Sequence, residues 1–239
     1  MKYSFVSILP MVLYGHMKGK LIVVDGGDGA GKQTQVDILI RRLIQEGHQA
    51  GTLDFPRYKA NSFGKLLREC LDGKRGDFLH IDPRIASTLY AADRFETKST
   101  IDEWLNEGRV VILDRYVTSN MMHQGSKIKD QAELEEFLGW LDNMEHEVFG
   151  LPRPDLVLYF KVDPVERIKM LQHASDKKEN VLDLAETNLE HQKQTDVTAG
   201  LVEKLNNWKG VECMHEGGVR TREDIHEEVY AIVKELINA

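Results

Sequence analysis

The chain has 239 residues, of which 41% are hydrophobic, and its formal net charge is −8, from 39 acidic and 31 basic residues. This length and composition fit one sizeable α/β domain, and the acidic balance argues against a surface that coats nucleic acid. The two cysteines, Cys70 and Cys213, are far apart and show no CxxC spacing, which argues against a disulfide framework or a structural zinc site. No apolar run approaches the roughly 20 residues that a membrane span needs.

The stretch LIVVDGGDGAGKQTQ, residues 21–35, carries the strongest local signal. Leu21–Val24 predicts a buried strand, and a helical pattern runs from Thr34 to Glu46. Between them, the spacing Gly26-x4-Gly31-Lys32 is typical of a phosphate-binding loop, in which backbone N–H groups converge on a polyphosphate. An ordinary glycine-rich turn is the alternative. We expect this loop to bind a nucleoside triphosphate, which the family resemblance given below implies to be ATP, through Gly26, Gly27, Asp28, Gly29, Ala30, Gly31, Lys32, Gln33 and Thr34.

Further along the chain, predicted strands and helices alternate. The pattern predicts strands at Ala50–Phe55, Arg109–Asp114 and Asp155–Val162 and a weaker one at Gly210–Met214, with helices at Asn61–Leu71, Asp82–Asn106 and Glu223–Ile237. The run RVVILD is apolar without alternation, as in parallel strands covered on both faces. This order predicts an α/β fold with a doubly wound parallel sheet of about five strands, helices on both faces and ligands at the carboxyl ends of its strands.

Polar side chains follow the predicted strands at this edge of the sheet. Asp114 and Arg115 come directly after one strand, where a carboxylate can hold Mg²⁺ and a guanidinium can bind a phosphate. Arg57 and Tyr58 follow another strand. Tyr90 and Arg94 are four apart in the long helix and share a face. Taken singly, each group also has a structural interpretation: a surface ion pair for Asp114 and Arg115, and a core aromatic residue with a solvated arginine for Tyr90 and Arg94. For Arg57 and Tyr58 alone, a proline-capped turn with a solvated arginine is the favoured interpretation.

In order and spacing, the phosphate loop with Asp28, then DFPRY, LYAADR and LDRYVTSN, resembles the thymidylate kinase family. The resemblance is specific from about residue 21 to 162. It implies ATP-dependent phosphorylation of dTMP to dTDP for dTTP synthesis on a P-loop kinase fold, with Mg²⁺ as cofactor, small-molecule substrates only and a homodimeric assembly.

The resemblance also implies a role for each matching residue. It assigns dTMP binding to Asp28, Phe55, Arg57, Tyr58, Tyr90, Arg94, Arg115, Ser119 and Asn120. Among these, Tyr90 stands where the family usually stacks a phenylalanine on thymine, and Asn120 is a candidate partner for the thymine imide. Lys32, Asp114 and Arg115 are implied to act in catalysis, with Asp114 also associated with Mg²⁺.

Two departures from the family pattern bear on catalysis. The residue after Lys32 is Gln33 rather than Ser or Thr, and its amide oxygen is a candidate Mg²⁺ ligand. Gly29 stands where some members carry a loop arginine, and the short helical lid expected at about 173–187 also lacks one. We therefore expect Lys177 and Lys178 to supply the catalytic lid charge, with Arg153 and Arg167 as nearby alternatives; a lysine cannot reproduce the planar guanidinium fork.

Residues 1–16 contain a lysine and a short apolar stretch, as a weak signal peptide would, but no A-x-A-like cleavage site. We expect them to be an extension outside the fold, residues 17–239 to form a single domain, and the protein to be cytoplasmic, where ATP is available. Three other functions stay open: a related nucleoside or nucleoside-monophosphate kinase of different base choice, a phosphate-loop ATPase or GTPase switch, and a binding-only homologue.

Overall fold

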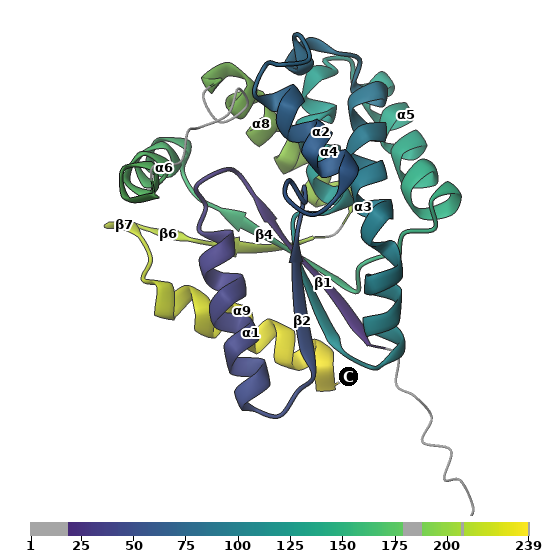
Figure 1. Ribbon diagram of the computed structural model, residues 1–239. Coiled ribbons are helices and arrows are strands. Elements are labelled where there is room, and N and C mark those ends of the chain that lie inside the picture. Colours follow the sequence, from purple (N-terminus) through teal and green to yellow (C-terminus); the bar gives the residue numbers. More distant parts are fainter. Residues whose placement is uncertain (1–18, 179–187, 207, 239) are drawn as a thin grey trace, which may run out of the picture.

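The computed structural model describes residues 19–178, 188–206 and 208–238 (Figure 1). The expected N-terminal extension, residues 1–16, and residues 179–187 of the expected lid lie outside this part of the chain. Among the described residues, no helix is long and apolar enough to cross a membrane.

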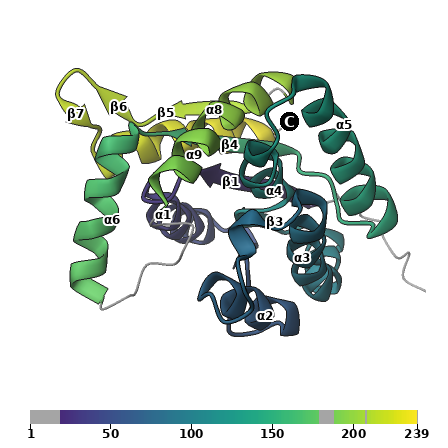
Figure 2. The same ribbon diagram turned by 90° about the horizontal axis from the view of Figure 1, so that it is seen from above.

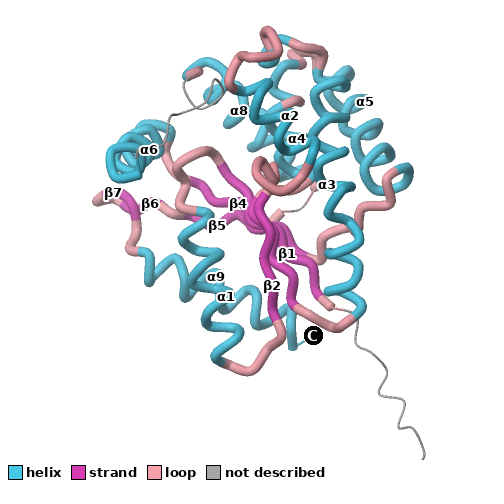
Figure 3. The backbone as a smooth tube through the Cα atoms, in the orientation of Figure 1, coloured by secondary structure: helices cyan, strands magenta, loops and turns pink. Residues whose placement is uncertain are grey.

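The centre of the fold is a five-stranded sheet in which all strand pairs are parallel. Its order is β2 (Ala50–Asp54), β3 (Val110–Asp114), β1 (Lys20–Gly26), β4 (Leu156–Lys161) and β5 (Lys209–Glu212). Figure 3 shows these strands together in the middle of the molecule. All residues of β3 are buried, as its uninterrupted apolar sequence predicts. The predicted fold class is confirmed.

Helices pack on both faces of the sheet (Figures 1 and 2). On one face lie α1 (Lys32–Gln45) and α9 (Arg222–Asn238), which share a hydrophobic core with Ile22 and Ile112. The other face is covered by α3 (Pro83–Asn106), α4 (Val117–His123), α5 (Gln131–Asp142) and α8 (Leu189–Leu205). The other helices of the described residues are α2 (Ser62–Leu71), α6 (Pro164–Lys178) and the short helical turns η1 (Phe78–His80), η2 (Gly125–Lys127) and η3 (Asn143–Val148).

Local sequence signals account for the ends of the main elements. Asp82 caps α3, because its side chain accepts hydrogen bonds from the backbone N–H groups of Arg84 at 2.8 Å and Ile85 at 3.3 Å, and Pro83 occupies the first turn. Helix α1 begins at Lys32, two residues before the predicted start, because the left-handed Gly31 (φ +82°) ends the loop there.

The C-terminal strand differs from the prediction. The strand expected at Gly210–Met214 spans Lys209–Glu212, and the chain then forms a small antiparallel hairpin of β6 (Met214–His215) and β7 (Gly218–Val219). The short spacing of these strands gave no pattern strong enough to predict the hairpin.

The register of the sheet determines which side chains meet. Asp54 and Asp114 are register partners at the ends of β2 and β3, and Val24 near the end of β1 pairs with Asp114. Three strand ends therefore open onto the same edge, where the loop between β1 and α1 begins.

Candidate active site

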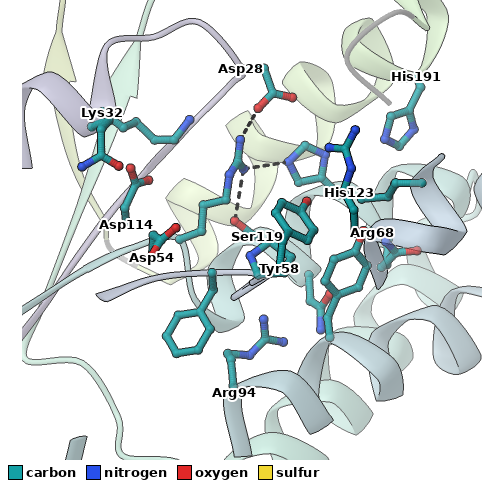
Figure 4. A pocket seen from close by; sticks show the side chains of 18 of the residues that line it. Asp28, Lys32, Asp54, Tyr58, Arg68, Arg94, Asp114, Ser119, His123 and His191 are labelled. Carbon is teal, nitrogen blue, oxygen red and sulfur yellow. Dashed lines mark hydrogen bonds and ion pairs between the residues drawn. The ribbon is translucent and has the colours of Figure 1, made fainter. Parts of the chain in front are cut away.

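A cavity of about 420 Å³ lies at this edge of the sheet (Figure 4), within the usual size range of small-molecule sites. Residues from the β1–α1 loop, the start of α1, the ends of β2 and β3, helices α2, α3, α4 and α8, and the turns η1 and η2 line it. They are Asp28, Gly29, Gly31, Lys32, Gln33, Thr34, Asp54, Phe55, Pro56, Tyr58, Arg68, Leu71, Phe78, Leu79, Tyr90, Arg94, Asp114, Arg115, Ser119, Asn120, His123, Gln124, Lys127 and His191.

The β1–α1 loop has the backbone shape of a phosphate cradle. Gly26, Gly29 and Gly31 have φ angles of +149°, +84° and +82°, a backbone conformation that residues other than glycine rarely adopt. Lys32 is 7% exposed, and its Nζ donates to the carbonyl oxygens of Gly26 at 2.9 Å and Gly27 at 3.0 Å. These two contacts hold the lysine ammonium against the loop that precedes α1, and the N-terminus of a helix is a favourable place for an anion to bind.

Helix α6 packs directly on this loop. Arg167 is 2% exposed, its Nη1 lies 3.5 Å from the carbonyl oxygen of Asp28, and its Nη2 pairs with Asp196 of α8. A Cβ at Gly27 would lie 1.7 Å from Arg167 Nη1, and one at Gly29 would lie 2.5 Å from the Arg167 carbonyl oxygen. Gly29 is therefore needed for the close approach of the α6 backbone, whereas a side chain at Gly27 would displace the Arg167 guanidinium.

Arg115 is the centre of a charged network just past β3. Its guanidinium pairs with Asp28, and its Nη1 lies 3.4 Å from Ser119 Oγ and 3.2 Å from His123 Nε2 (dashed lines in Figure 4). Nη1 also lies 3.8 Å from Asp25, which is fully buried. The residue itself has a φ of +66°, so the backbone turns sharply to direct this side chain.

The network changes the protonation of its members. The charge of Arg115, with Lys32, outweighs burial and holds the pKa of Asp28 well below its usual range. Burial, assisted by the charge of Arg115, lowers the pKa of His123 to about 3. A guanidinium can only donate hydrogen bonds, so His123 Nε2 is the acceptor, which agrees with a neutral imidazole.

A second group of polar side chains lies beside Lys32. Asp114 is 8% exposed, its Oδ1 is buried without a hydrogen-bond partner, and burial raises the pKa of its carboxyl. Asp54 and Gln33 line the same edge and share a second, smaller cavity with Asp114. Gln33 donates from Nε2 to Asp37 at 2.9 Å. Among the described residues, no cluster of three His, Cys, Asp or Glu side chains forms a complete metal site.

At the end of the cavity away from the phosphate loop, the lining consists of aromatic rings and polar side chains. Tyr58, Tyr90 and Phe55 contribute rings, and Arg94 and Asn120 contribute polar groups from α3 and α4. In the view of Figure 4, Arg94 lies across the pocket from Asp28. This combination can enclose a planar ring and hydrogen-bond its edge.

Most of the predicted site residues meet at this cavity, but not all of them line it. Gly26, Gly27 and Ala30 form the loop backbone behind the lining. Arg57 is not a lining residue; its backbone N–H donates to Asp93 Oδ2 at 3.0 Å. Lys177 and Lys178 end α6, and their side chains lie outside what the structure describes.

The two alternative lid arginines are clearly distinguished by the structure. Arg153 is exposed and pairs with Asp142 at 2.6 Å and Glu147 at 3.0 Å, and it is not a lining residue of the cavity. Arg167 contacts the phosphate loop as described above.

Several lining residues were not predicted as part of the site. Asp54 carries the same strand-end signal as Asp114 and could have been found by the same argument. Arg68, whose Cζ lies 5.7 Å from the Tyr58 ring centroid, comes from α2, and His191 comes from α8. No local pattern marks these two, because only the packing of the helices brings them to the cavity.

Comparison with known proteins agrees with this geometry. The family model described as thymidylate kinase matches residues 24–212. The thymidylate kinase of Homo sapiens is 30% identical over 221 residues, 92% of each chain, and that of Schizosaccharomyces pombe is 27% identical over 219 residues, 92% of this chain and 93% of the relative. The structure of Candida albicans thymidylate kinase superposes with a TM-score of 0.69 at 24% identity, over 92% of this chain and 93% of that one, and shows the same fold. The chain therefore belongs to the thymidylate kinase family and is a phosphotransferase.

Proposed function

We propose that the chain transfers the γ-phosphoryl group of ATP to dTMP, forming dTDP for dTTP synthesis. The observation that carries this proposal is that one cavity joins a phosphate loop, with its buried Lys32, to an aromatic and amide-lined end that includes Arg94 and Asn120. Arg115 lies between the two ends, bound to Asp28. ATP would lie on residues 26–34 and dTMP against Phe55, Tyr58 and Tyr90.

Phosphoryl transfer depends mainly on positioned cations around the transferring group. Lys32 is preorganised by its two carbonyl contacts, and Arg115 by Asp28, Ser119 and His123. Groups held in place in this way stabilise developing charge without reorganising during the reaction. We assign no general base, because a phosphate acceptor is already a competent nucleophile.

The residues beside Lys32 fit a Mg²⁺ ion. Asp114 offers a buried carboxylate oxygen without a partner, with Asp54 and Gln33 at the same edge. Mg²⁺ usually binds proteins through one or two carboxylates and completes its shell with water and phosphate oxygens, so this incomplete site is sufficient. When bound, Mg²⁺ would neutralise phosphate charge.

Two sets of residues are candidates for the catalytic cation that we expect from the lid. Lys177 and Lys178 remain our expectation, and Arg167 is the described alternative because its guanidinium touches the phosphate loop. Arg167→Lys and the double variant Lys177→Ala, Lys178→Ala separate the two. The substitution that lowers kcat with little change in the KM for ATP identifies the catalytic cation.

The reaction is tested by ADP release from ATP–Mg²⁺ with dTMP, dUMP, dCMP, dGMP or no acceptor. Turnover with dTMP well above the others supports the proposal, and ADP release that is independent of an acceptor indicates an ATPase. Arg115→Ala should lower kcat about 100- to 1,000-fold, the usual cost of removing one preorganised donor. Arg153→Ala, in an exposed ion pair, is the matched control and should keep wild-type turnover.

We also propose a cytoplasmic homodimer. Support for the dimer comes from apolar side chains at one surface: Phe95 is 52% exposed and Val148 69% exposed, and the Phe95 ring lies 5.4 Å from that of Phe149. Light scattering after size exclusion would give the assembly size. Phe95→Glu should shift a dimer to monomer if this surface is the interface.

A further inference from the structure

A buried carboxylate lies behind the base end of the cavity and is not one of its lining residues. Glu145, in the π-helical turn η3, is 0% exposed. Its two oxygens accept hydrogen bonds from Arg94, at 2.7 Å from Nε and 2.5 Å from Nη2. This bidentate pair fixes the plane of the guanidinium. Arg94 itself is 2% exposed and lines the cavity.

The same carboxylate fixes the orientation of a second cavity residue. Asn120 donates from Nδ2 to Glu145 Oε1 at 2.9 Å and to the carbonyl oxygen of Ser87 at 3.2 Å. Both partners can only accept, so they select the amide nitrogen of Asn120 and turn its Oδ1 away from them. Among the hydrogen bonds of the described residues, none uses Asn120 Oδ1 or Arg94 Nη1, so an acceptor and a donor are left for a ligand.

We propose that Glu145 is a positioning residue that sets the base specificity of the site, an inference that rests on the proposed function. With Glu145 in place, Arg94 offers a donor and Asn120 offers an acceptor. A pyrimidine with a 4-carbonyl oxygen and an N3–H group matches this pair, which selects thymine or uracil.

Cytosine reverses both positions, because its N4 amine donates and its N3 accepts. Sites built to hydrogen-bond a ligand reject analogues that leave buried polar groups unpaired. Glu145 would therefore discriminate between bases without touching either one.

The substitution Glu145→Gln tests this role with little change in shape. A glutamine presents one oxygen and one NH2 group to three donors from Arg94 and Asn120, so at least one donor faces another donor. Either the bidentate hydrogen bonds of Arg94 or the orientation of the Asn120 amide must therefore change. The matched control is Glu147→Gln, two residues along the same turn, where the side chain is 64% exposed.

The measurements are kcat and KM for dTMP, dUMP and dCMP, together with calorimetric affinities for dTMP and dCMP and a thermal unfolding curve. For Glu145→Gln we expect the KM for dTMP to rise and the dTMP-to-dCMP ratio of kcat/KM to fall, each by about tenfold or more, the size of one lost hydrogen bond to a charged group. The kcat at saturating dTMP should change much less, and Glu147→Gln should match the wild type.

A folded Glu145→Gln protein with the wild-type ratio would overturn the proposal, as would equal losses for all three acceptors. If Glu145→Gln does not fold, Asn120→Ala replaces it, because alanine has no acceptor and the substitution leaves the Arg94–Glu145 pair intact. This variant must also lower the dTMP-to-dCMP ratio of kcat/KM, and an unchanged ratio overturns the proposal. Wild-type turnover of dTMP tests the proposed function separately, and the calorimetric affinities report on Glu145 even in a chain without turnover. A wild-type chain that binds neither nucleotide overturns both proposals.

Discussion

Replacing His123 by glutamine should remove a pH dependence of stability that the active-site network creates. The imidazole is held between Arg115, 3.2 Å from its Nε2, and His191, whose ring centroid is 5.8 Å away. Burial and the charge of Arg115 lower its pKa to about 3. Lys32 and His191 act in the same direction, whereas Asp28 opposes them. Glutamine keeps an oxygen that can accept from Arg115 but does not titrate.

The direction and size of this pH dependence follow from the difference between the pKa of His123 in the folded and in the unfolded chain. A histidine has a pKa of about 6.5 in the unfolded chain, so the unfolded state takes up a proton below that pH while folded His123 stays neutral until about pH 3. Stability is therefore lost as the pH falls through this window. Between pH 7 and pH 5 the unfolded state gains about 2 kcal/mol from this one site, because the folded pKa of about 3 lies well below 5.

Urea unfolding at pH 7 and pH 5 measures the effect. The free energy of unfolding of the His123→Gln variant should fall by about 2 kcal/mol less than that of the wild type between the two pH values. His215→Asn, at an exposed position of the β6–β7 hairpin, serves as the control because, among the described residues, no hydrogen bond or ion pair joins His215 to these groups. Equal losses in the wild type and His123→Gln would show that His123 titrates normally in the folded protein and would refute this reasoning.

Two other changes test the phosphate loop and the metal site. Gly29→Ala should destabilise the protein by about 1–3 kcal/mol and lower kcat, because the added Cβ would lie 2.5 Å from the Arg167 carbonyl oxygen at a φ of +84°; urea unfolding and ADP release check this. The matched control Gly139→Ala, on α5 with no atom within 4 Å of the added Cβ, should raise the Tm by about 2–4 °C because alanine favours the helix. Asp114→Asn should raise the Mg²⁺ concentration for half-maximal turnover by about tenfold or more, measured by titration of Mg²⁺ at saturating nucleotides; an unchanged value would remove Asp114 from the metal site.

The sequence predicts best those elements in which the local backbone conformation or burial allows only a few residue types. Leu21–Val24, the glycines that follow and the Asp82–Pro83 helix start each depend on backbone conformation or burial that only certain residues allow. The strand ends at Asp54 and Asp114 converge because parallel strands share an edge, so the location of the site also follows from the pattern.

The parts that the sequence did not predict depend on packing between distant segments. His191 and His123 lie 68 positions apart, and their rings stack only because α8 packs beside α4. Glu145 lies in a π-helical turn whose sequence, NMEHEV, shows no motif, yet it accepts hydrogen bonds from Arg94, 51 positions earlier. A charged residue in a short irregular segment is more often solvated, so periodicity alone could not identify it as buried.

The arginines of the site show how the position of a carboxylate partner determines what a guanidinium can do. Arg94 is paired with Glu145, which is fully buried behind the cavity, so a ligand cannot displace that partner and the guanidinium keeps one orientation. Arg115 is paired with Asp28, which itself lines the cavity. A bound phosphate can therefore compete with Asp28 for the Arg115 fork, and released Asp28 becomes free to accept a hydrogen bond from a ligand hydroxyl. The fixed pair suits recognition of a base edge, and the exchangeable pair suits a phosphate that must arrive, react and leave.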